Sequence, residues 1–420
     1  MKVLWFTNSP CSSIKRNNGK TLSGGWLTSL ENALKCEEDI NLSIAFISNS
    51  EKDPFIFEGT TYYPILDKAP QNPIKKIINR IKPLSQKEEK LLPSMLHIIQ
   101  QCQPDIIHIH GTEECFGLIA EHITTIPIVF SIQGLIAPYR EKFFSGLSYY
   151  DIKKHEGWYN KLKMTSIKED FQSFIYRGER ECKYLKKASY IMGRTFWDKD
   201  ITFLLNPNRK YFIVNEILRD EFYTTQWEKS AFENELQIVS ILSLGVYKGM
   251  ETILKAVQLL TNYANFKFTW HIIGYEPHTP ILQITEKILS LNHQDYNIKL
   301  HGRLDAQQIA NLFKTSDIYC HVSHIENSPN SVCEAMIMGM PIIASYAGGT
   351  SSLLEHEKDG LLIQDGDPYI LAGAICNLQK DFKKAQQYGL NAQAKATLRH
   401  NPKNIVRELL YAYKEIVNLK

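Results

Sequence analysis

The sequence has little excess charge, no metal-type cysteine pair and no long apolar run. Its 420 residues hold 48 Lys and Arg against 45 Asp and Glu, a balance that argues against general nucleic-acid binding. None of the eight cysteines forms a CxxC pair, which argues against a zinc module and favours free thiols in a reducing cytoplasm. No apolar run is long enough to cross a bilayer, and the opening MKVLWF is interpreted as a buried strand rather than a signal peptide. We therefore expect a soluble protein, attached at most to a membrane surface.

Short β-branched runs alternate with longer stretches of helical periodicity along the chain. This alternation begins again after Phe222, which predicts two successive α/β units, each a parallel sheet with helices on both faces. We expect domains at residues 1–222 and 223–402, then an amphipathic helix at 403–420 that could pack on either domain, including back on the first. The predicted strands are Lys2–Thr7, Leu42–Ser48, Ile106–Ile109, Ile126–Ile132, Tyr190–Met192, Gln237–Leu244, Lys267–Ile273, Ile298–His301, Ile318–Val322 and Pro341–Ser345. Doubly wound sheets bind ligands beyond the carboxyl ends of their strands, so residues just after strands are candidates for the site.

The densest signal is the segment His321–Thr350, HVSHIENSPNSVCEAMIMGMPIIASYAGGT. Ser328 suits an N-cap and Pro329 suits the first helical position, where a missing N–H costs nothing. Gly339 and Pro341 would end the helix. The segment thus predicts a helix of about three turns between two strands.

The start of this helix is predicted to be a phosphate site. Asn330 and Ser331 lie in its first turn, where unpaired N–H groups and the positive end of the helix dipole favour an anion. Glu326 lies on the loop before the helix and Glu334 within it. Taken singly, both acids could be surface residues and the glycine pair at 348–349 an ordinary turn. Their combination favours a functional site.

The segment resembles the signature of the retaining nucleotide-sugar glycosyltransferases of family 4. The family motif is two glutamates separated by seven residues, then Ala, Gly-x-Pro and Gly-Gly, and here it reads ENSPNSVCEAMIMGMP…GG. The resemblance extends over nearly the whole chain and is strongest between residues 237 and 375. It implies an α/β GT-B fold, with two Rossmann-like doubly wound domains facing a central cleft. The N-terminal domain would bind the acceptor and the C-terminal domain the nucleotide-sugar.

The resemblance also implies roles for the matching residues. Glu326 would lie near the donor sugar, and Glu334 would accept hydrogen bonds from the ribose hydroxyls. Asn330 and Ser331 would offer backbone N–H groups to the diphosphate. Lys248, in LSLGVYKGMETILKAV, would neutralise that diphosphate. A lysine flanked by glycines at a strand-to-helix junction also suits a phosphate contact on physical grounds. Without the glycines, a surface lysine exposed to water would be the default interpretation. Glu326 and Lys248 are the catalytic candidates.

In the N-terminal domain the matches are weaker. Gly24 and Gly25 match the Gly-Gly of the loop after the first strand and would approach the nucleotide-sugar, with a plain flexible loop as the competing interpretation. His108 and His110 lie on the same face of a strand; His110 is nearer the cleft and could contact a sugar hydroxyl, while His108 could be a core residue. Gln133 replaces a histidine found in many family members, which leaves a polar sugar contact.

Other positions depart from the family pattern. Arg194 follows a strand and could reach a phosphate or the acceptor, with an interdomain salt bridge as the alternative. The family arginine before Lys248 is absent, and Arg303 could supply that nucleotide contact instead. Thr-Ser-Ser follows the Gly-Gly pair where Pro-Glu is usual in the family. The sequence therefore does not indicate which donor sugar is bound. The DxD-like triplet at 365–367 is interpreted as a polar turn, so no metal and no cofactor are expected.

These features favour a metal-independent glycosyltransferase of polysaccharide or glycan assembly. It would move a sugar from a nucleotide-diphosphate donor to a glycan or lipid-linked acceptor with retention of anomeric configuration. A catalytically weak GT-B subunit that binds a nucleotide or glycan for a partner enzyme is the alternative, kept open by the missing arginine and Pro-Glu step. Another GT-B enzyme, such as an epimerase or an inverting transferase, is disfavoured by the two-glutamate spacing.

A membrane contact is a further expectation. In Pro73–Leu84, four isoleucines occupy one helical face with basic residues around it. The stretches Gln71–Leu92 and Arg140–Lys187 have net charges of +4 and +5, which would concentrate positive charge in the first domain. Such a surface could attach a cytoplasmic protein to the inner face of the cytoplasmic membrane. A solvated basic helix packed on the core is an alternative interpretation of equal weight.

Overall fold

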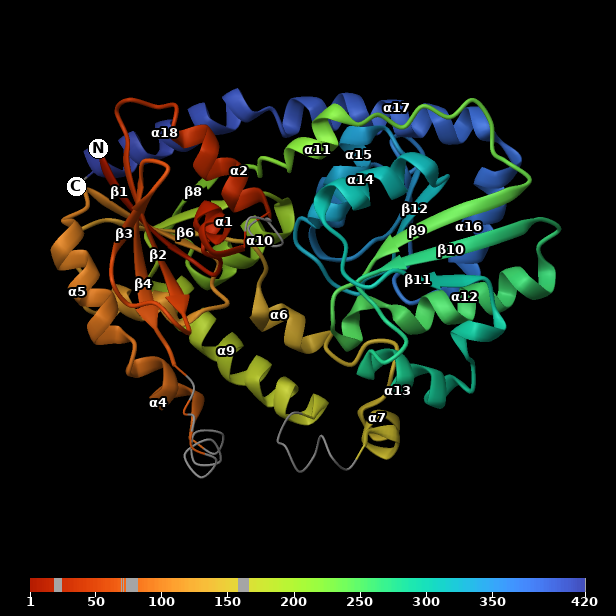
Figure 1. The fold of residues 1–420 in the computed structure, drawn as a ribbon, viewed down its shortest axis with the longest axis horizontal. Coiled ribbons are helices and arrows are strands. Elements are labelled where there is room, and N and C mark those ends of the chain that lie inside the picture. The colour runs from red at the N-terminus through yellow and green to blue at the C-terminus, as the bar shows by residue number, and fades with distance from the viewer. Residues whose placement is uncertain (19–24, 69, 71, 73–81, 158–165, 420) are drawn as a thin grey trace. The chain divides into compact units, whose positions relative to one another are not determined.

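The computed structural model describes residues 1–18, 25–68, 70, 72, 82–157 and 166–419, which divide into two compact units (Figure 1). Unit 1 consists of Met1–Pro138, Gln172–Ile217 and His400–Lys420. Unit 2 consists of Tyr139–Phe171 and Leu218–Arg399. The expected domain boundary at residue 222 lies close to the passage at 217–218. The sequence prediction placed residues 139–171 in the first domain, whereas the structure groups them with unit 2.

Unit 1 is built on an eight-stranded sheet in the order β3-β4-β2-β1-β5-β6-β7-β8. Neighbouring strands are parallel, except that β3 runs antiparallel to β4. The strands are β1 (Lys2–Thr7), β2 (Asn41–Ser48), β3 (Phe55–Phe57), β4 (Thr60–Leu66), β5 (Ile106–His110), β6 (Ile128–Ser131), β7 (Tyr190–Gly193) and β8 (Lys210–Ile213). Chain order reverses between β1 and β5, so the loops after these two strands diverge at the ligand-binding edge of a doubly wound sheet.

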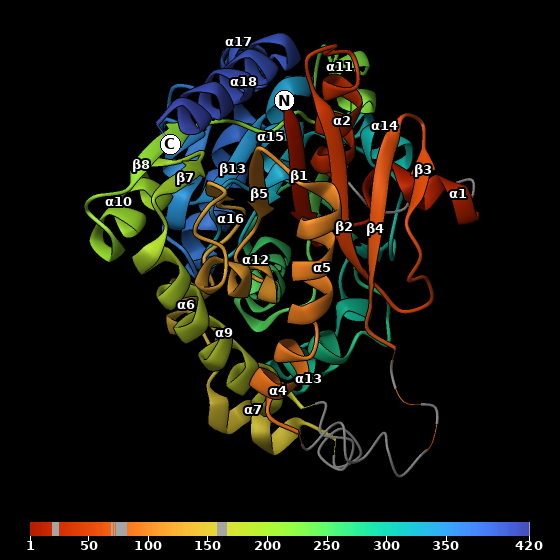
Figure 2. The same cartoon turned by 90° about the vertical axis from the view of Figure 1, so that its left-hand side faces the viewer.

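Helices cover both faces of this sheet because side chains alternate along each strand. Along β1, Val3 and Trp5 belong to the core shared with α2 and α18, whereas Leu4 and Phe6 belong to the core shared with α5 (Figure 2). The helical elements of unit 1 are η1 (Cys11–Ile14), α1 (Lys15–Asn18), α2 (Gly25–Leu34), α4 (Leu84–Glu89), α5 (Leu92–Cys102), η2 (Cys115–Glu121), α10 (Phe196–Leu205) and α18 (Pro402–Asn418). The helices α6 (Ile136–Glu141) and α9 (Ile167–Lys187) run across the passages between the units.

Unit 2 contains a six-stranded, all-parallel sheet in the order β11-β10-β9-β12-β13-β14. The strands are β9 (Glu235–Ile241), β10 (Lys267–Ile273), β11 (Ile298–Leu300), β12 (Ile318–His321), β13 (Ile342–Ser345) and β14 (Leu361–Ile363). The helical elements are α7 (Tyr149–His155), α11 (Asp220–Thr224), η3 (Val246–Lys248), α12 (Met250–Tyr263), α13 (Pro280–Leu289), η4 (His293–Asp295), α14 (Ala306–Thr315), α15 (Asn330–Met338), η5 (Gly348–Ser352), α16 (Pro368–Lys380) and α17 (Phe382–Arg399). Here the order reverses between β9 and β12.

The ten predicted strands all exist, with ends that differ by a few residues, but four strands were not predicted. They are β3, β4, β8 and β14. β3 and β14 have three residues each and β8 has four, although the three-residue β11 was predicted. β4 contains Pro64, and a proline within a run argues against a strand.

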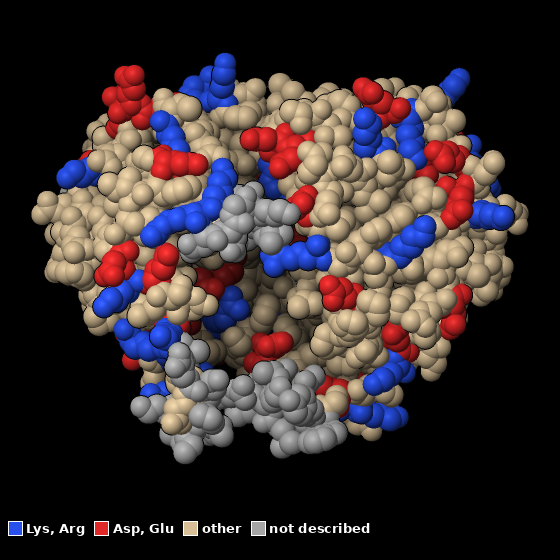
Figure 3. Space-filling view, in the orientation of Figure 1, with Lys and Arg blue, Asp and Glu red and all other residues tan. Residues whose placement is uncertain are grey.

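The membrane interpretation receives no structural support. Residues 73–81 of the segment Pro73–Leu84 lie outside the described residues. In the part of the chain that the structure describes, no helix combines the length and apolarity needed to cross a bilayer. Residues 140–171, which are part of the basic stretch Arg140–Lys187, belong to unit 2 rather than to the first domain. Basic and acidic side chains are interspersed on the face shown in Figure 3.

The C-terminal helix α18 closes the core of unit 1 with a buried hydrogen-bond network. The hydroxyl of Tyr413 accepts a hydrogen bond from Trp5 Nε1 at 2.9 Å and lies 2.6 Å from His108 Nδ1. The other ring nitrogen of His108 lies 2.6 Å from Ser131 Oγ. One phenolic hydroxyl thus joins α18 to β1 and β5, and through His108 to β6.

We expect Tyr413→Phe to lower the free energy of unfolding by about 2 kcal/mol, because it leaves buried partners on Trp5 and His108 unsatisfied. Chemical denaturation followed by tryptophan fluorescence would measure the change. Tyr411→Phe is the matched control, since Tyr411 lies on the same helix with 62% of its surface exposed. If both substitutions lowered the free energy of unfolding equally, the hydrogen bonds of Tyr413 would not be what stabilises the protein here.

Candidate functional site

The main site candidates of unit 2 lie beyond the carboxyl ends of two adjacent strands. Lys248 ends η3 in the connection after β9, and Glu326 lies on the loop after β12. These two strands are neighbours in the sheet and flank the point where the strand order reverses. The topology therefore brings together two residues that are 78 positions apart in the sequence.

Lys248 and Glu326 form an ion pair that is largely shielded from water. Lys248 Nζ donates to Glu326 Oε1, and their side chains are 12% and 15% exposed. Ser323 Oγ donates to the same carboxylate oxygen at 3.3 Å. Burial alone would raise the pKa of Glu326, but the charge of Lys248 outweighs it and holds this pKa below its usual value. Burial would likewise lower the pKa of Lys248, and Glu326 raises it instead. Both groups are therefore charged at neutral pH, which excludes the surface-acid interpretation of Glu326.

Two glycines let the backbones around this pair approach closely. Gly249 has φ +83°, and a Cβ there would lie 2.2 Å from the carbonyl oxygen of Val322. Gly348 has φ +56°, and a Cβ there would lie 2.0 Å from the carbonyl oxygen of Glu326. The neighbouring N–H of Gly349 donates to that same oxygen at 2.8 Å. Glycine is needed at both positions because any side chain would clash with backbone, and the Gly-Gly pair fixes the loop that holds Glu326.

The helix after Glu326 begins one residue later than the sequence suggested. Pro329, not Ser328, is the N-cap residue, and α15 starts at Asn330 without a side-chain cap. The N–H groups of Val332 and Cys333 donate to Pro329 O, so those of Asn330 and Ser331 have no acceptor within the helix. Asn330 Oδ1 is buried and has no hydrogen-bond partner among the described residues. This end of α15 is suited to an anion.

Glu334 lies within α15 and is already engaged. Its two oxygens accept hydrogen bonds from Arg219 Nε and Nη2, each at 2.8 Å, and its side chain is only 4% exposed. The surface-acid interpretation of Glu334 is therefore also excluded. Sequence reasoning did not identify Arg219, because this partner lies 115 residues away at the N-cap of the short helix α11 and no local motif marks it.

A second buried charged cluster surrounds His324. Its Nε2 lies 2.8 Å from Glu251 Oε1 and its Nδ1 lies 3.3 Å from Asp365 Oδ2, which also accepts from Lys142. Burial alone would lower the pKa of His324, but Glu251 and then Asp365 outweigh it and raise this pKa. Asp367 caps α16 by accepting from two backbone N–H groups. The DxD-like triplet thus serves as a turn and a cap.

The candidates of unit 1 also lie at the carboxyl ends of neighbouring strands. His110 ends β5, Gln133 follows β6 and Arg194 follows β7. His110 is buried, and both of its ring nitrogens lack a hydrogen-bond partner among the described residues. Burial, then the neighbouring His108 and Arg194, hold the pKa of His110 well below its usual value, so the imidazole is neutral. Buried polar atoms without partners are uncommon, and those of His110 are available to a ligand.

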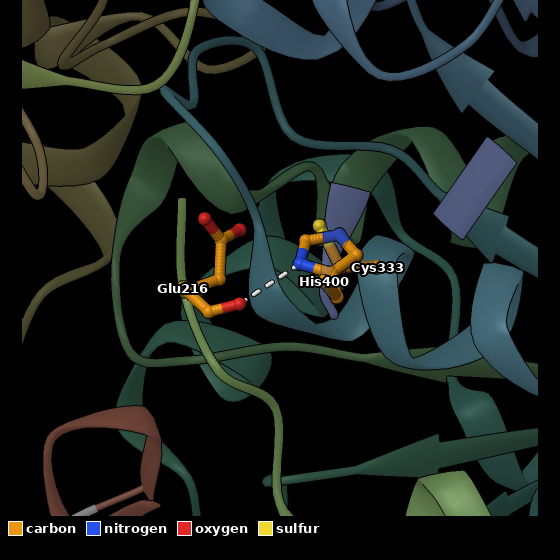
Figure 4. A group of neighbouring side chains, drawn as sticks. All are labelled: Glu216, Cys333 and His400. Carbon is orange, nitrogen blue, oxygen red and sulfur yellow. Dashed lines mark hydrogen bonds between the residues drawn. The ribbon is translucent and has the colours of Figure 1, made fainter. Parts of the chain in front are cut away.

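The Arg194–Glu216 salt bridge lies inside unit 1 and is not the interdomain one considered from the sequence. The guanidinium of Arg194 lies 4.0 Å from the ring centre of Trp26, and its Nε lies 3.6 Å from Glu216 Oε2. The main chain of Glu216 is held in turn by His400, whose Nδ1–H donates to the Glu216 carbonyl oxygen at 3.0 Å (Figure 4). Cys333, which the figure also labels, belongs to unit 2. Arg194 is thus a buried, paired residue.

The remaining candidates are less well defined. Gly24 lies outside the described residues, and Gly25 is the exposed first residue of α2 with φ +40°. Arg303 is exposed on the loop between β11 and α14 and forms no ion pair among the described residues. The structure therefore brings Lys248 and Glu326 together, on a loop that leads to the start of α15, and no ion pair joins Arg303 to them among the described residues.

Comparison with solved structures defines the class. Sucrose-phosphate synthase from Thermosynechococcus elongatus superposes with a TM-score of 0.73 at 14% identity, over the whole of both chains. Anabaena HepE in complex with UDP and glucose gives a TM-score of 0.66 at 16% identity, over 99% of this chain and 100% of HepE. The chain has the GT-B fold, an α/β architecture of two Rossmann-like domains.

Sequence comparison finds similarity to glycosyltransferases. Residues 235–381 match the family described as "Glycosyl transferases group 1". An uncharacterised glycosyltransferase of Methanocaldococcus jannaschii is 27% identical over 260 residues, which cover 57% of this chain and 65% of that protein. The amylovoran biosynthesis glycosyltransferase AmsK of Erwinia amylovora is 27% identical over 187 residues, which cover 43% of this chain and 45% of AmsK. The chain thus spans about half to two thirds of the length of these curated relatives.

The His324 cluster predicts a pH-dependent stability. Because the pKa of His324 is raised in the folded protein, its stabilisation is fully present below about pH 6.5 and is lost as pH rises through the folded pKa. His324→Gln should therefore destabilise the protein by about 2 kcal/mol at pH 5.5 and by less at pH 9. Thermal unfolding at the two pH values would measure this, with the 80% exposed His278→Gln as control. A destabilisation by His324→Gln that is larger at pH 9 than at pH 5.5 would contradict the raised pKa assigned to His324.

Proposed function

We propose that the chain is a retaining glycosyltransferase of family 4 that transfers a sugar from a nucleoside diphosphate donor to a hydroxyl of a glycan or lipid-linked acceptor. The observation that carries this proposal is the buried Lys248–Glu326 pair at the strand-order reversal of unit 2, where the loop that holds Glu326 leads into the open N–H groups at the start of α15. A cation, a carboxylate and a helix N-terminus are the groups that cleavage of a sugar–diphosphate bond requires.

The chemistry follows from where charge develops. As the bond to the anomeric carbon breaks, the leaving diphosphate gains negative charge, which Lys248 and the N–H groups of Asn330 and Ser331 would stabilise. The sugar gains positive charge, and Glu326 is suited to stabilise it because its depressed pKa keeps the carboxylate ionised. Glu326 acts as an electrostatic and positioning group, and the leaving phosphate helps to deprotonate the acceptor hydroxyl on the same face.

The acceptor side of the reaction is assigned to unit 1. The unpartnered nitrogens of His110 suit a sugar hydroxyl, and Gln133 and Arg194 supply polar groups at the same edge of the sheet. The UDP and UDP-glucose complexes of HepE support a nucleotide-sugar donor, and the name of AmsK supports polysaccharide biosynthesis. Neutralisation of the diphosphate by Lys248 and α15 makes a metal ion unnecessary in this scheme.

We place this activity in the cytoplasm, with contact to the inner face of the cytoplasmic membrane through Pro73–Leu84. The support for this contact is the sequence pattern of isoleucines and basic residues alone. Binding to vesicles that contain anionic phospholipid, and its loss when the four basic residues of the segment are replaced by glutamine, would test it.

Glu326→Gln and Lys248→Ala should each lower turnover by about 10²–10³-fold, because each removes one electrostatic contact to the transition state. Release of nucleoside diphosphate that requires an acceptor would be measured with purified protein and a panel of UDP-, GDP- and ADP-sugars. NMR of the product would show whether the anomeric configuration of the donor is kept, and EDTA should leave the rate unchanged.

The exposed pair Lys358–Glu355 supplies matched controls. Lys358→Ala and Glu355→Gln change the same residue types at side chains that are 66% and 61% exposed, and both should retain wild-type turnover. Folding of each variant would be checked by its melting temperature. Wild-type rates in both site variants would refute the site assignment, and tight nucleotide binding without turnover under any acceptor would favour the non-catalytic subunit.

A further inference from the structure

The carboxylate of Glu113 is a polar group at the ligand-binding edge of unit 1 that the reaction described above does not use. Glu113 lies on the loop between β5 and η2, three residues after His110. The loop after β5 borders the strand-order reversal of this sheet, where doubly wound sheets bind their ligands. The side chain is only partly buried, so a ligand can reach it.

A glycine holds this carboxylate against the sheet. Gly111 has φ +90°, and a Cβ there would lie 2.1 Å from Glu113 Oε2 and 3.5 Å from Gln133 Cδ. The acid and the amide of Gln133 therefore approach the same point, although they follow different strands. The N–H of Gly134 donates to the second oxygen, Oε1, at 3.2 Å. Glu113 is thus fixed between the loops after β5 and β6, and any residue other than glycine at position 111 would displace it.

The main chain of Glu113 is held by two arginines of α9. Arg177 Nε and Arg180 Nη2 both donate to its carbonyl oxygen, at 3.1 and 2.6 Å. Arg180 is also paired with Glu88. Within the described residues, neither arginine forms an ion pair with the carboxylate of Glu113. The two guanidinium groups therefore fix the position of Glu113 without binding its side chain.

A shielded carboxylate without an ion pair destabilises a fold unless hydrogen bonds compensate it. Burial raises the pKa of Glu113, and its own N–H, then the charge of Arg177 and the N–H of Gly134, offset this only in part. Stability therefore gives little reason for an acid at this position. A perturbed carboxyl group at a ligand-binding edge is a candidate for function.

The nearby acid Glu181 shows the contrast with a structural role. It is fully buried and accepts hydrogen bonds from the N–H groups of Ile136 and Ala137, at 3.1 and 2.8 Å, and from the hydroxyl of Thr112. In the part of the chain that the structure describes, the carboxylate of Glu113 has a single donor from another residue, the N–H at position 134. Glu181 is occupied by the fold, whereas Glu113 is placed by the fold and left accessible.

The arrangement suits a hydroxyl better than a phosphate. An ionised carboxylate only accepts hydrogen bonds, and a sugar hydroxyl can donate one to it, while the amide of Gln133 offers both a carbonyl and an NH₂ group. Hydrogen bonds to a charged acceptor are stronger than those between neutral groups. A phosphate on the ligand would instead be repelled by the charge of Glu113, most strongly where water is excluded.

We propose that Glu113 is a specificity-determining residue of the acceptor site, which accepts a hydrogen bond from a hydroxyl of the acceptor sugar and selects neutral sugars over phosphorylated ones. This inference rests on the proposed function and narrows its acceptor to a glycan whose sugar at this position carries no anionic group. His110, Gln133 and Arg194 cannot make this selection, because none of them is an acid.

The test uses purified protein and, as probe acceptors, methyl glycosides of glucose, galactose, mannose and N-acetylglucosamine with the corresponding 6-phosphates. Release of nucleoside diphosphate from UDP-, GDP- and ADP-sugars gives kcat and KM for each acceptor. The wild type should use at least one neutral glycoside with a kcat/KM about tenfold or more above that of its 6-phosphate. Glu113→Gln keeps the shape and the Gly134 contact but loses the charge, and it should reduce this preference about fivefold or more.

Two further variants separate this role from a structural one. Glu114→Gln changes the same residue type one position along, where the side chain does not cap η2, and it should leave the preference unchanged. Tyr413→Phe should lower the melting temperature and also leave the preference unchanged. A general loss of structure would lower kcat/KM for both acceptors, whereas loss of the Glu113 charge should raise KM for the neutral glycoside and lower it for the phosphate.

The outcomes distinguish this inference from the proposed function. If the wild type uses a neutral glycoside and Glu113→Gln keeps the wild-type preference, the inference is refuted while the proposed function stands. The same holds if the wild type prefers the 6-phosphates, or transfers sugar to other acceptors but to no methyl glycoside. A reduced preference in Tyr413→Phe would show that destabilisation explains the effect, which also refutes the inference. If no nucleotide-sugar is turned over with any acceptor, both the proposed function and this inference fail.

Discussion

The site of unit 2 depends on keeping one lysine and one glutamate charged in a place that water hardly reaches. Removing two charges from water costs more free energy than most single contacts return, so such a pair persists only where its surroundings hold it. At Lys248 and Glu326 the surroundings are backbone: Gly249 packs against Val322, and Gly348 packs against Glu326 itself. The ion pair therefore depends on these two glycines, because only glycine allows the backbones around it to approach so closely. The free-energy cost of removing Lys248 from water is already covered when the protein folds. A diphosphate that binds beside Lys248 would therefore not add that cost.

The same part of unit 2 depends on a segment that is distant in sequence. Residues 139–171 lie between two stretches of unit 1, yet Tyr139 and Phe143 pack their rings against Tyr247, next to Lys248. Gly146 leaves the space that Glu251 and His324 occupy. The backbone N–H of His324 donates to Tyr247 O at 2.8 Å, two residues before Glu326. The His324 cluster thus fixes both loops that carry the ion pair, so protonation of His324 bears on the site as well as on stability.

Local patterns in the sequence predicted most of the sheet framework and the main site. β-branched runs predicted ten of the strands, and the segment with the two glutamates placed Glu326, Glu334, Asn330 and Ser331 on one loop and helix. What the sequence could not predict is pairing at long range. Arg219 with Glu334, His324 with Glu251, and Arg194 with Glu216 come from different elements, and nothing in the chain around one partner encodes the other. The strands β3, β8, β14 and the proline-containing β4 were missed for a different reason, since the sequence pattern within each of them is too weak to predict a strand.

In the proposed reaction, the absence of an arginine before Lys248 would change how the charge of the diphosphate is balanced. Tyr247 occupies the adjacent position, and its ring centre lies 5.0 Å from Lys248 Nζ, a cation–π contact that orients the ammonium without adding charge. Arg303 is exposed and Arg219 is paired with Glu334, so neither arginine is placed beside the Lys248–Glu326 pair as an additional cation. In the proposed reaction, the leaving group would then be stabilised mainly by one ammonium and by the N–H groups of α15. Such a site gains more from exclusion of water than from added charge, because a single cation and a few backbone dipoles act strongly only where the local dielectric constant is low.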